Sequence, residues 1–196
     1  MPHPKKHVGG AAASYHDALM RMIQFNMTRY IALLRAVNVG GTGKLPMADL
    51  KSICHDLGFA RIETYIASGN VVFESTVAPP KVKSALEARL LEYAGKPIGV
   101  VVRTAAELRA ILKANPFPDA DPRCTYAVFL DRNPPRDALD HAVGQSDEKM
   151  SLGGREIFVH YPSGMGRSKL KIPAAKMGTA RNMNTVAKLA EMTSKP

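Results

Sequence analysis

Apolar residues in the first part of the chain recur in patterns that predict alternating strands and helices. Apolar and β-branched residues dominate 29–37, and the turn formers at 38–41 end this segment, so it predicts a buried central strand. Apolar residues spaced i, i+3, i+4 and i+7 follow Pro46 and stop at Gly58, a pattern typical of an amphipathic helix. By the same reasoning we expect a hairpin over 61–73, a helix over 79–93 and a strand over 98–103.

The order strand, helix, strand, strand, helix, strand is the split βαββαβ arrangement of ferredoxin-like folds, in which two helices cover one face of an antiparallel sheet. The rest of the chain repeats most of this order. Thr104 and Glu107 predict a capping box at the start of a helix, and Pro116 prevents that helix from continuing. Four further elements are predicted, a strand over 126–130, a short helix opening at Pro134, a hairpin around 153–154 and a helix from about 168.

We therefore predict an α+β fold of two ferredoxin-like sub-domains, which comprise residues 27–104 and 105–196. Residues 1–26 lie outside this pattern. They contain three of the six histidines and no apolar core long enough for a secretory signal, and Met27 begins the first strand segment. We expect a disordered N-terminal extension over 1–26, and a transit peptide is the alternative.

Basic residues are concentrated near the C-terminus. The chain carries 27 Lys and Arg against 17 Asp and Glu, a formal charge of +10, and residues 165–196 contribute +6 of it. A local excess of positive charge favours an anionic partner such as nucleic acid. No apolar run approaches the roughly 20 residues that a bilayer requires, so we expect no membrane partner.

The cysteines indicate neither a metal site nor a disulfide framework. Cys54 and Cys124 stand far apart, without a CxxC motif or a histidine at ligand spacing. We predict no metal and no cofactor, and a reducing cytoplasm suits two free thiols. The oligomeric state stays open.

Several motifs, in order along the chain, resemble the bacterial family catalogued as domain of unknown function 1697. They are Arg35-Ala36-Val37-Asn38-Val39-Gly40-Gly41, Leu45-Pro46-Met47, Tyr65-Ile66-Ala67-Ser68-Gly69-Asn70-Val71-Val72-Phe73, Asn115-Pro116-Phe117, Ser168-Lys169-Leu170 and Thr179-Ala180-Arg181-Asn182-Met183-Asn184-Thr185-Val186. The resemblance covers residues 27–193, and it implies a two-part α+β fold and occurrence in bacteria but no reaction. Where the family pattern usually has Gly, Gln and Trp, this chain has Ala36, Ala67 and Met183, which removes an amide and an aromatic ring from the motifs.

Two loops carry polar residues that can contact an anion. Asn38 and Lys44 flank a glycine-rich loop whose backbone N–H groups can approach an anion, although its spacing is not that of a Walker loop. Ser68 and Asn70 offer a hydroxyl and an amide at the hairpin turn. Local turn geometry also explains these residue types, so each loop is either a ligand contact or simply a turn.

The segment 179–186 holds the densest set of polar side chains. Arg181 offers a planar fork of donors, and Asn182 and Asn184 offer amides. In one hypothesis these groups bind phosphate together with Lys169, Lys171 and Lys176. In the other they tie the C-terminal helix to the end of the first strand and satisfy buried backbone groups between the halves.

Three functions are compatible with these residues. The leading hypothesis is a non-catalytic binding protein for an anionic ligand, with nucleic acid as the expected partner. The first alternative is an enzyme that acts on a phosphorylated or nucleotide-like small molecule in the cleft between the halves, with Arg35, Lys44 and Arg181 holding charge and Tyr65 donating a proton. The second alternative is an interaction scaffold without a ligand. No motif carries a carboxylate that can act as a base, so no catalytic residue is assigned.

Overall fold

The first half of the chain forms a four-stranded antiparallel sheet with two helices. The computed structural model describes residues 27–38 and 44–194. Its first half contains β1 (Thr28–Leu34), α2 (Met47–Asp56), β2 (Ala60–Tyr65), β3 (Asn70–Ser75), α3 (Pro79–Ala94) and β4 (Val100–Thr104). The strands lie in the order β2-β3-β1-β4, and each neighbouring pair is antiparallel. The predicted βαββαβ order of this half is confirmed.

The second half repeats the sheet but places its helices differently. It contains α4 (Ala105–Lys113), β5 (Thr125–Phe129), β6 (Lys149–Leu152), β7 (Glu156–His160), two 3-10 turns (Met165–Arg167 and Pro173–Ala175), β8 (Thr179–Asn182) and α5 (Met183–Met192). The sheet order β6-β7-β5-β8 corresponds strand by strand to that of the first sheet, and all pairs are antiparallel. The α-helices here precede and follow the four strands. The α+β class with two antiparallel sheets is confirmed.

Two helices predicted for the second half differ from the structure. The segment that follows Pro134 forms turns instead of a helix, and among residues 134–142 only Ala138 is fully buried. The helix expected from about 168 begins only at α5, because β8 comes first. The buried positions of β8 are Thr179 and Arg181, so no apolar alternation identifies this strand.

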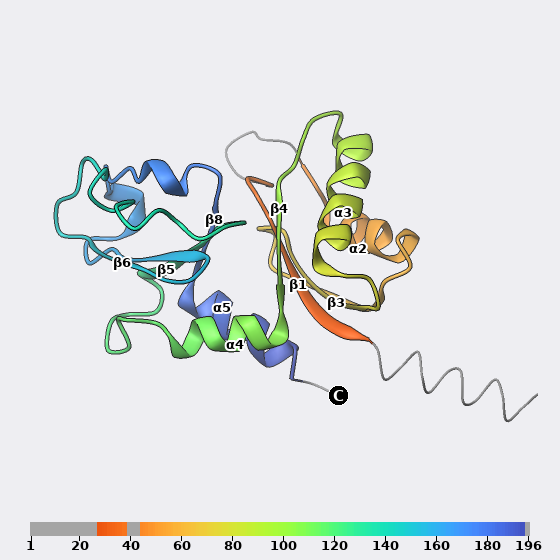
Figure 1. Cartoon of the computed structure of the whole chain (residues 1–196). Helices are drawn as coiled ribbons and strands as arrows, with labels where there is room; N and C mark the ends of the chain where they lie inside the picture. Colours follow the sequence, from red (N-terminus) through yellow and green to blue (C-terminus); the bar gives the residue numbers. More distant parts are fainter. Residues whose placement is uncertain (1–26, 39–43, 195–196) are drawn as a thin grey trace, which may run out of the picture.

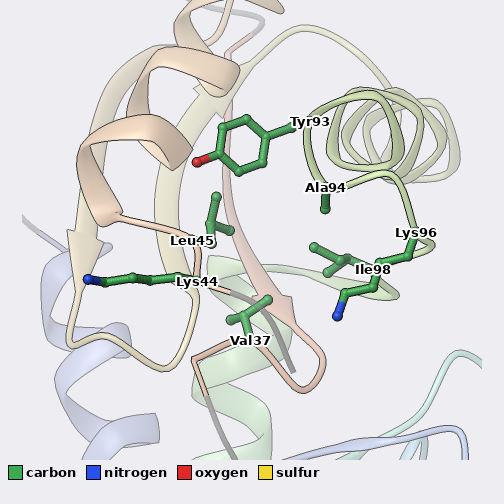
Figure 2. A pocket seen from close by; sticks show the side chains of 7 residues that line it. All are labelled: Val37, Lys44, Leu45, Tyr93, Ala94, Lys96 and Ile98. Carbon is green, nitrogen blue, oxygen red and sulfur yellow. The ribbon is translucent and has the colours of Figure 1, made fainter. Parts of the chain in front are cut away.

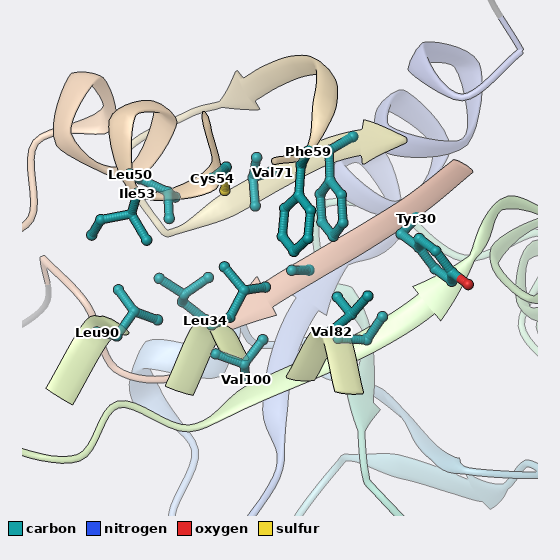
Figure 3. Close-up of a cluster of buried hydrophobic side chains, with 14 of the residues drawn as sticks. Tyr30, Leu34, Leu50, Ile53, Cys54, Phe59, Val71, Val82, Leu90 and Val100 are labelled. Carbon is teal, nitrogen blue, oxygen red and sulfur yellow. The ribbon is translucent and has the colours of Figure 1, made fainter. Parts of the chain in front are cut away.

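Both faces of the first sheet are buried. Alternate residues of a strand point to opposite sides. Tyr30, Ala32 and Leu34 of β1 belong to an apolar cluster with α2 and α3, which Figure 3 shows from close by. Ile31 and Leu33 face a second cluster on the other side of the sheet. The first sheet is therefore the central layer of the molecule.

The second apolar cluster joins the two halves. It brings Val72 and Val101 of the first sheet together with Phe129 and Phe158 of the second. Figure 1 shows α4 and α5, which supply most of the remaining residues, lying side by side below the two sheets. The other face of the second sheet packs against loops and 3-10 turns instead of helices. Because both halves fill the shared cluster, neither half buries all of its apolar surface alone.

The capping box at the start of α4 is confirmed. The main-chain N–H of Glu107 donates to the hydroxyl of Thr104 at 3.2 Å, and the main-chain N–H of Thr104 donates to the Glu107 carboxylate at 2.7 Å. The second oxygen of the same carboxylate accepts a hydrogen bond from Arg155, in the turn between β6 and β7. This glutamate therefore fixes both a helix end and a neighbouring hairpin.

Candidate functional site

Arg181 lies at the seam between the halves, where its guanidinium group contacts main-chain oxygens. The residue is 7% exposed. Its Nη2 donates to the carbonyl oxygens of Leu34 and Ser68 at 2.9 and 2.8 Å, both in the first half. Its Nη1 donates to the Thr179 hydroxyl and its Nε to Oδ1 of Asn70. Burial lowers the pKa of Arg181 to about 10, so the group stays charged at neutral pH. Its donors contact protein groups instead of an open cavity.

Asn70 and Ser68 support this arginine from the hairpin between β2 and β3. Asn70 is fully buried, and its Nδ2 donates to the carbonyl oxygen of Tyr65 at 2.9 Å and to the Ser68 hydroxyl at 3.0 Å. Gly69 between them has a φ of +75°, and a Cβ there would lie 2.4 Å from Cγ2 of Val37. Only glycine fits this position. The hairpin turn therefore presents its carbonyls to the arginine in a fixed geometry.

Asn38 holds the chain where it leaves β1. Its Nδ2 donates to the carbonyl oxygens of Leu45 and Ala67 at 2.8 and 2.7 Å, and its Oδ1 accepts the N–H of Leu45 at 2.8 Å. Asn38, Ala36 and Ile66 have φ values of 56°, 50° and 48°, in the left-handed region that side chains other than glycine rarely adopt. Backbone strain is thus gathered where β1 ends and the hairpin turns.

The remaining predicted site residues lie apart from this group. Arg35 is half-buried, and its Nη1 lies 3.3 Å from Sδ of Met177. Lys169 is exposed and lines a separate polar pocket. Asn182 caps α5, since its Oδ1 accepts a main-chain N–H of the first turn at 2.9 Å, and Asn184 is exposed on that turn. The structure therefore gathers the hairpin residues around Arg181 but not the whole predicted set.

A second buried arginine, which sequence reasoning missed, mirrors Arg181. Arg103 of β4 is 1% exposed. Its Nη2 donates to the carbonyl oxygens of Leu130 and Arg155 at 2.7 and 2.9 Å, both in the second half. Each half thus supplies one arginine to the other. The one signal in the sequence was a basic residue within an apolar strand segment. Such a residue is also expected in an edge strand with one exposed face.

The two arginines occupy corresponding places in the two sheets. Arg103 pairs with Ile31 of β1, and Arg181 pairs with Ala127 of β5. Arg181 binds the carbonyl oxygen of Leu34, three positions after Ile31, which is the strand partner of Arg103. Arg103 binds the carbonyl oxygen of Leu130, three positions after Ala127, which is the strand partner of Arg181. Each also binds a carbonyl in the hairpin turn of the opposite half. The seam therefore has approximate twofold symmetry.

A pocket of about 420 Å³ opens between the end of β1, the start of α2 and the end of α3. Its lining residues are Val37, Lys44, Leu45, Tyr93, Ala94, Lys96 and Ile98 (Figure 2). In Figure 2 the ammonium group of Lys96 turns toward Val37, and Lys44 extends outward from the rim. The glycines predicted to contact an anion, in 39–43, lie outside the described residues.

The charged side chains among the described residues that line this pocket are basic. Two lysines and no carboxylate occur among the described residues that line it. The Tyr93 hydroxyl donates to Asp49 at the first turn of α2, and this hydrogen bond raises the pKa of Tyr93, so its phenol stays neutral. Tyr65, the predicted proton donor, packs against the shared core instead. Apolar walls with a few polar groups are typical of small-molecule sites.

The described part of the chain has no cluster of metal-ligating side chains, and one of its two thiols is deeply buried. No group of three or more His, Cys, Asp or Glu residues there could hold a metal ion. Cys54 is fully buried, and burial raises the pKa of its thiol to about 12. No helix in the described ranges is long and apolar enough to cross a bilayer.

These features define an α+β protein of two corresponding sheets that share a core and exchange buried arginines. The chain matches the family "Protein of unknown function (DUF1697)" over residues 27–158 and belongs to that family, as the motifs predicted. Among solved structures it is similar to the conserved bacterial protein SP0830 from Streptococcus pneumoniae, with 26% identity and a TM-score of 0.72, over 86% of this chain and 99% of that one. No curated protein matches the chain significantly.

Proposed function

We propose that this protein is a non-catalytic binding protein for a small anionic ligand with an apolar body, held in the pocket between α2 and α3. The observation that carries the proposal is that two lysines and four apolar residues line the pocket, with no carboxylate among the described lining residues. An ammonium group beside apolar walls favours a ligand that offers both a negative charge and an apolar surface.

The same lining argues against catalysis in this pocket. General acid–base chemistry requires a group that exchanges a proton near neutral pH. The Tyr93 phenol is held by Asp49 with a raised pKa, and no other acid, histidine or cysteine occurs among the described lining residues. The two lysines therefore attract an anion, and the described lining residues supply no general base.

A matched pair of probes tests the proposal. Phenyl phosphate and phenol share a ring, and only the first carries charge at neutral pH. We expect phenyl phosphate to shift the backbone amide NMR signals of Val37, Leu45 and Ile98, with an affinity about tenfold higher than that of phenol, because one charge-assisted contact contributes roughly 1.4 kcal/mol or more. Equal affinities, or shifts elsewhere only, would contradict the proposal.

Lysine variants localise the charge that attracts the probe. We expect Lys44→Ala and Lys96→Ala to weaken phenyl phosphate binding and to leave phenol binding unchanged. Lys51→Ala is the matched control, because Lys51 is exposed on α2 and does not line the pocket. A loss of the same size in the Lys51→Ala variant would show non-specific charge attraction, which would also contradict the proposal.

A parallel test decides whether the protein binds nucleic acid, the larger anionic partner predicted from the C-terminal charge. Among the basic residues that favoured it, Arg181 is buried, and Lys188 pairs with Glu191 at 2.9 Å. For a partner held by about four phosphate contacts, affinity for a 20-nucleotide strand falls about a hundredfold between 50 and 200 mM salt. Such a fall, with no response to phenyl phosphate, would favour nucleic acid over the small ligand.

A further inference from the structure

A second pocket, of about 330 Å³, lies in the cleft between the two halves. Four of its lining residues are basic. The described lining residues are Pro79, Pro80, Lys83, Val102 and Arg103 from the first half and Asp131, Arg132 and Arg155 from the second. Clefts between sub-structures are common places for ligand sites. The charge of this cleft therefore identifies it as a candidate site separate from the pocket between α2 and α3.

The cations of the cleft differ in how they are held. Lys83 forms an ion pair with Asp131, the one carboxylate among the described lining residues. Arg155 forms an ion pair with Glu107 of α4. Arg132 is exposed and has no ion-pair or hydrogen-bond partner within the described part of the chain. Two cations are thus anchored in place, and one is available to an incoming ligand.

Main-chain carbonyls hold the Arg103 guanidinium group beside the cleft. This group is fully buried and donates to the main-chain carbonyls of Val102, Leu130 and Arg155 at 3.0, 2.7 and 2.9 Å. Burial and the neighbouring charge of Arg155 lower the pKa of Arg103 to about 10. The charges of Arg103 and Arg155 repel each other, and the carboxylates of Glu156, Glu107 and Asp131 offset part of that repulsion.

We propose that this cleft binds a compact, multiply charged oxoanion of the pyrophosphate class, contacted by Arg132 and Arg155 over the buried Arg103. Guanidinium groups present paired donors that match the oxygens of phosphate groups. Pro79 and Pro80 begin α3 and have no N–H, so the start of this helix offers no main-chain donor at these two positions. The proposal does not rest on the proposed function, because no described residue lines both pockets.

Calorimetric titration of the whole protein with inorganic pyrophosphate at 50 mM salt, without divalent metal, tests the proposal. We expect one pyrophosphate per chain. Arg132→Ala should weaken binding about tenfold or more, because it removes charge-assisted hydrogen bonds to the ligand from a side chain that has no other partner among the described residues. Arg155→Gln should weaken it similarly, and circular dichroism checks that this variant, which loses the contact with Glu107, still folds.

Two matched variants separate specific from general attraction. Arg109→Ala removes an exposed arginine of α4 that does not line the cleft, and Lys44→Ala disables the other pocket. Both should bind pyrophosphate within about twofold of the wild type. No binding of pyrophosphate, an equal loss in Arg109→Ala, or unchanged binding in Arg132→Ala would overturn the proposal. A loss in Lys44→Ala would also overturn it and would point to the first pocket instead.

Discussion

Single residues hold the seam because no other side chain supplies the same donors in the same directions. Arg181 reaches three elements at once, the end of β1, the β2–β3 turn and its own strand. A buried carbonyl that loses its donor costs about 1–3 kcal/mol. Arg181 therefore has a structural role, and its substitution tests whether it also contacts a ligand.

We predict that Arg181→Ala lowers the free energy of unfolding by about 3 kcal/mol or more, because it leaves several buried acceptors without donors. Asn184→Ala, an exposed change in the same motif, should stay within about 0.5 kcal/mol. Urea denaturation measures both values. If Arg181→Ala left stability unchanged and abolished anion binding instead, the side chain would be a ligand contact.

Ala36 is a residue whose replacement should stabilise the protein. It is exposed and has a φ of 50°, which strains a residue with a Cβ but not glycine. We expect Ala36→Gly to raise the free energy of unfolding by about 0.5–1 kcal/mol, or roughly 1–4 °C in Tm. Ala32→Gly is the control, because Ala32 is buried in an extended strand, and this change should destabilise. A lower Tm for Ala36→Gly would contradict the strain argument.

At the scale of elements, the start of α4 connects the two halves. The Glu107 carboxylate accepts hydrogen bonds from Thr104 and contacts Arg155 of the β6–β7 turn. Partial burial alone would raise the pKa of Glu107, but the hydrogen bonds from Thr104 and the charge of Arg155 outweigh it and lower the pKa below its usual 4.5.

A carboxyl whose pKa is lowered by folding adds stability above its unfolded-state pKa, and the contribution disappears as pH falls through the folded-state value. We therefore expect Glu107→Gln to destabilise the protein at pH 7 and to differ less from the wild type as pH falls below about 4.5. Urea denaturation over a pH series gives the difference. A constant difference at every pH would argue against a charged role.

At the scale of the whole molecule, the shared apolar cluster and the exchanged arginines make one cooperative structure from two similar sheets. β1, β3 and β4 contribute one face to this cluster, and α4, α5 and the second sheet contribute the other. Removing either half would expose the apolar face of the other, which would cost about 25 cal/mol for each Å² uncovered.

We predict that the fragments 27–104 and 105–194 do not fold separately, because each loses its partner in the shared cluster and its donated arginine. Each fragment alone should show poor dispersion of backbone amide NMR signals, and mixing the two should restore a dispersed spectrum. Well-dispersed spectra of both isolated fragments would show two independent domains, contrary to this prediction.

Local elements were predictable because their determinants are close together in the sequence. The apolar spacing of α2 and the capping box of Thr104 and Glu107 require only neighbouring residues, and both occur as predicted. β8 was missed because its buried positions are polar. Arg103 was missed because its carbonyl partners lie 27 and 52 positions away in the chain. Of the residues that line the pocket between α2 and α3, only Lys44 was predicted as an anion contact. Lys96 reaches this pocket from the loop that follows α3.

The sequence by itself determined the α+β class, the family and most helices and strands, because hydrophobic periodicity and capping act over a few residues. Only the tertiary structure decided which polar groups meet. Whether a guanidinium group faces solvent or a distant carbonyl depends on how the two sheets pack, and that packing comes from apolar contacts spread over the whole chain. The buried roles of Arg103 and Arg181, and the two charged pockets, are consequences of that packing.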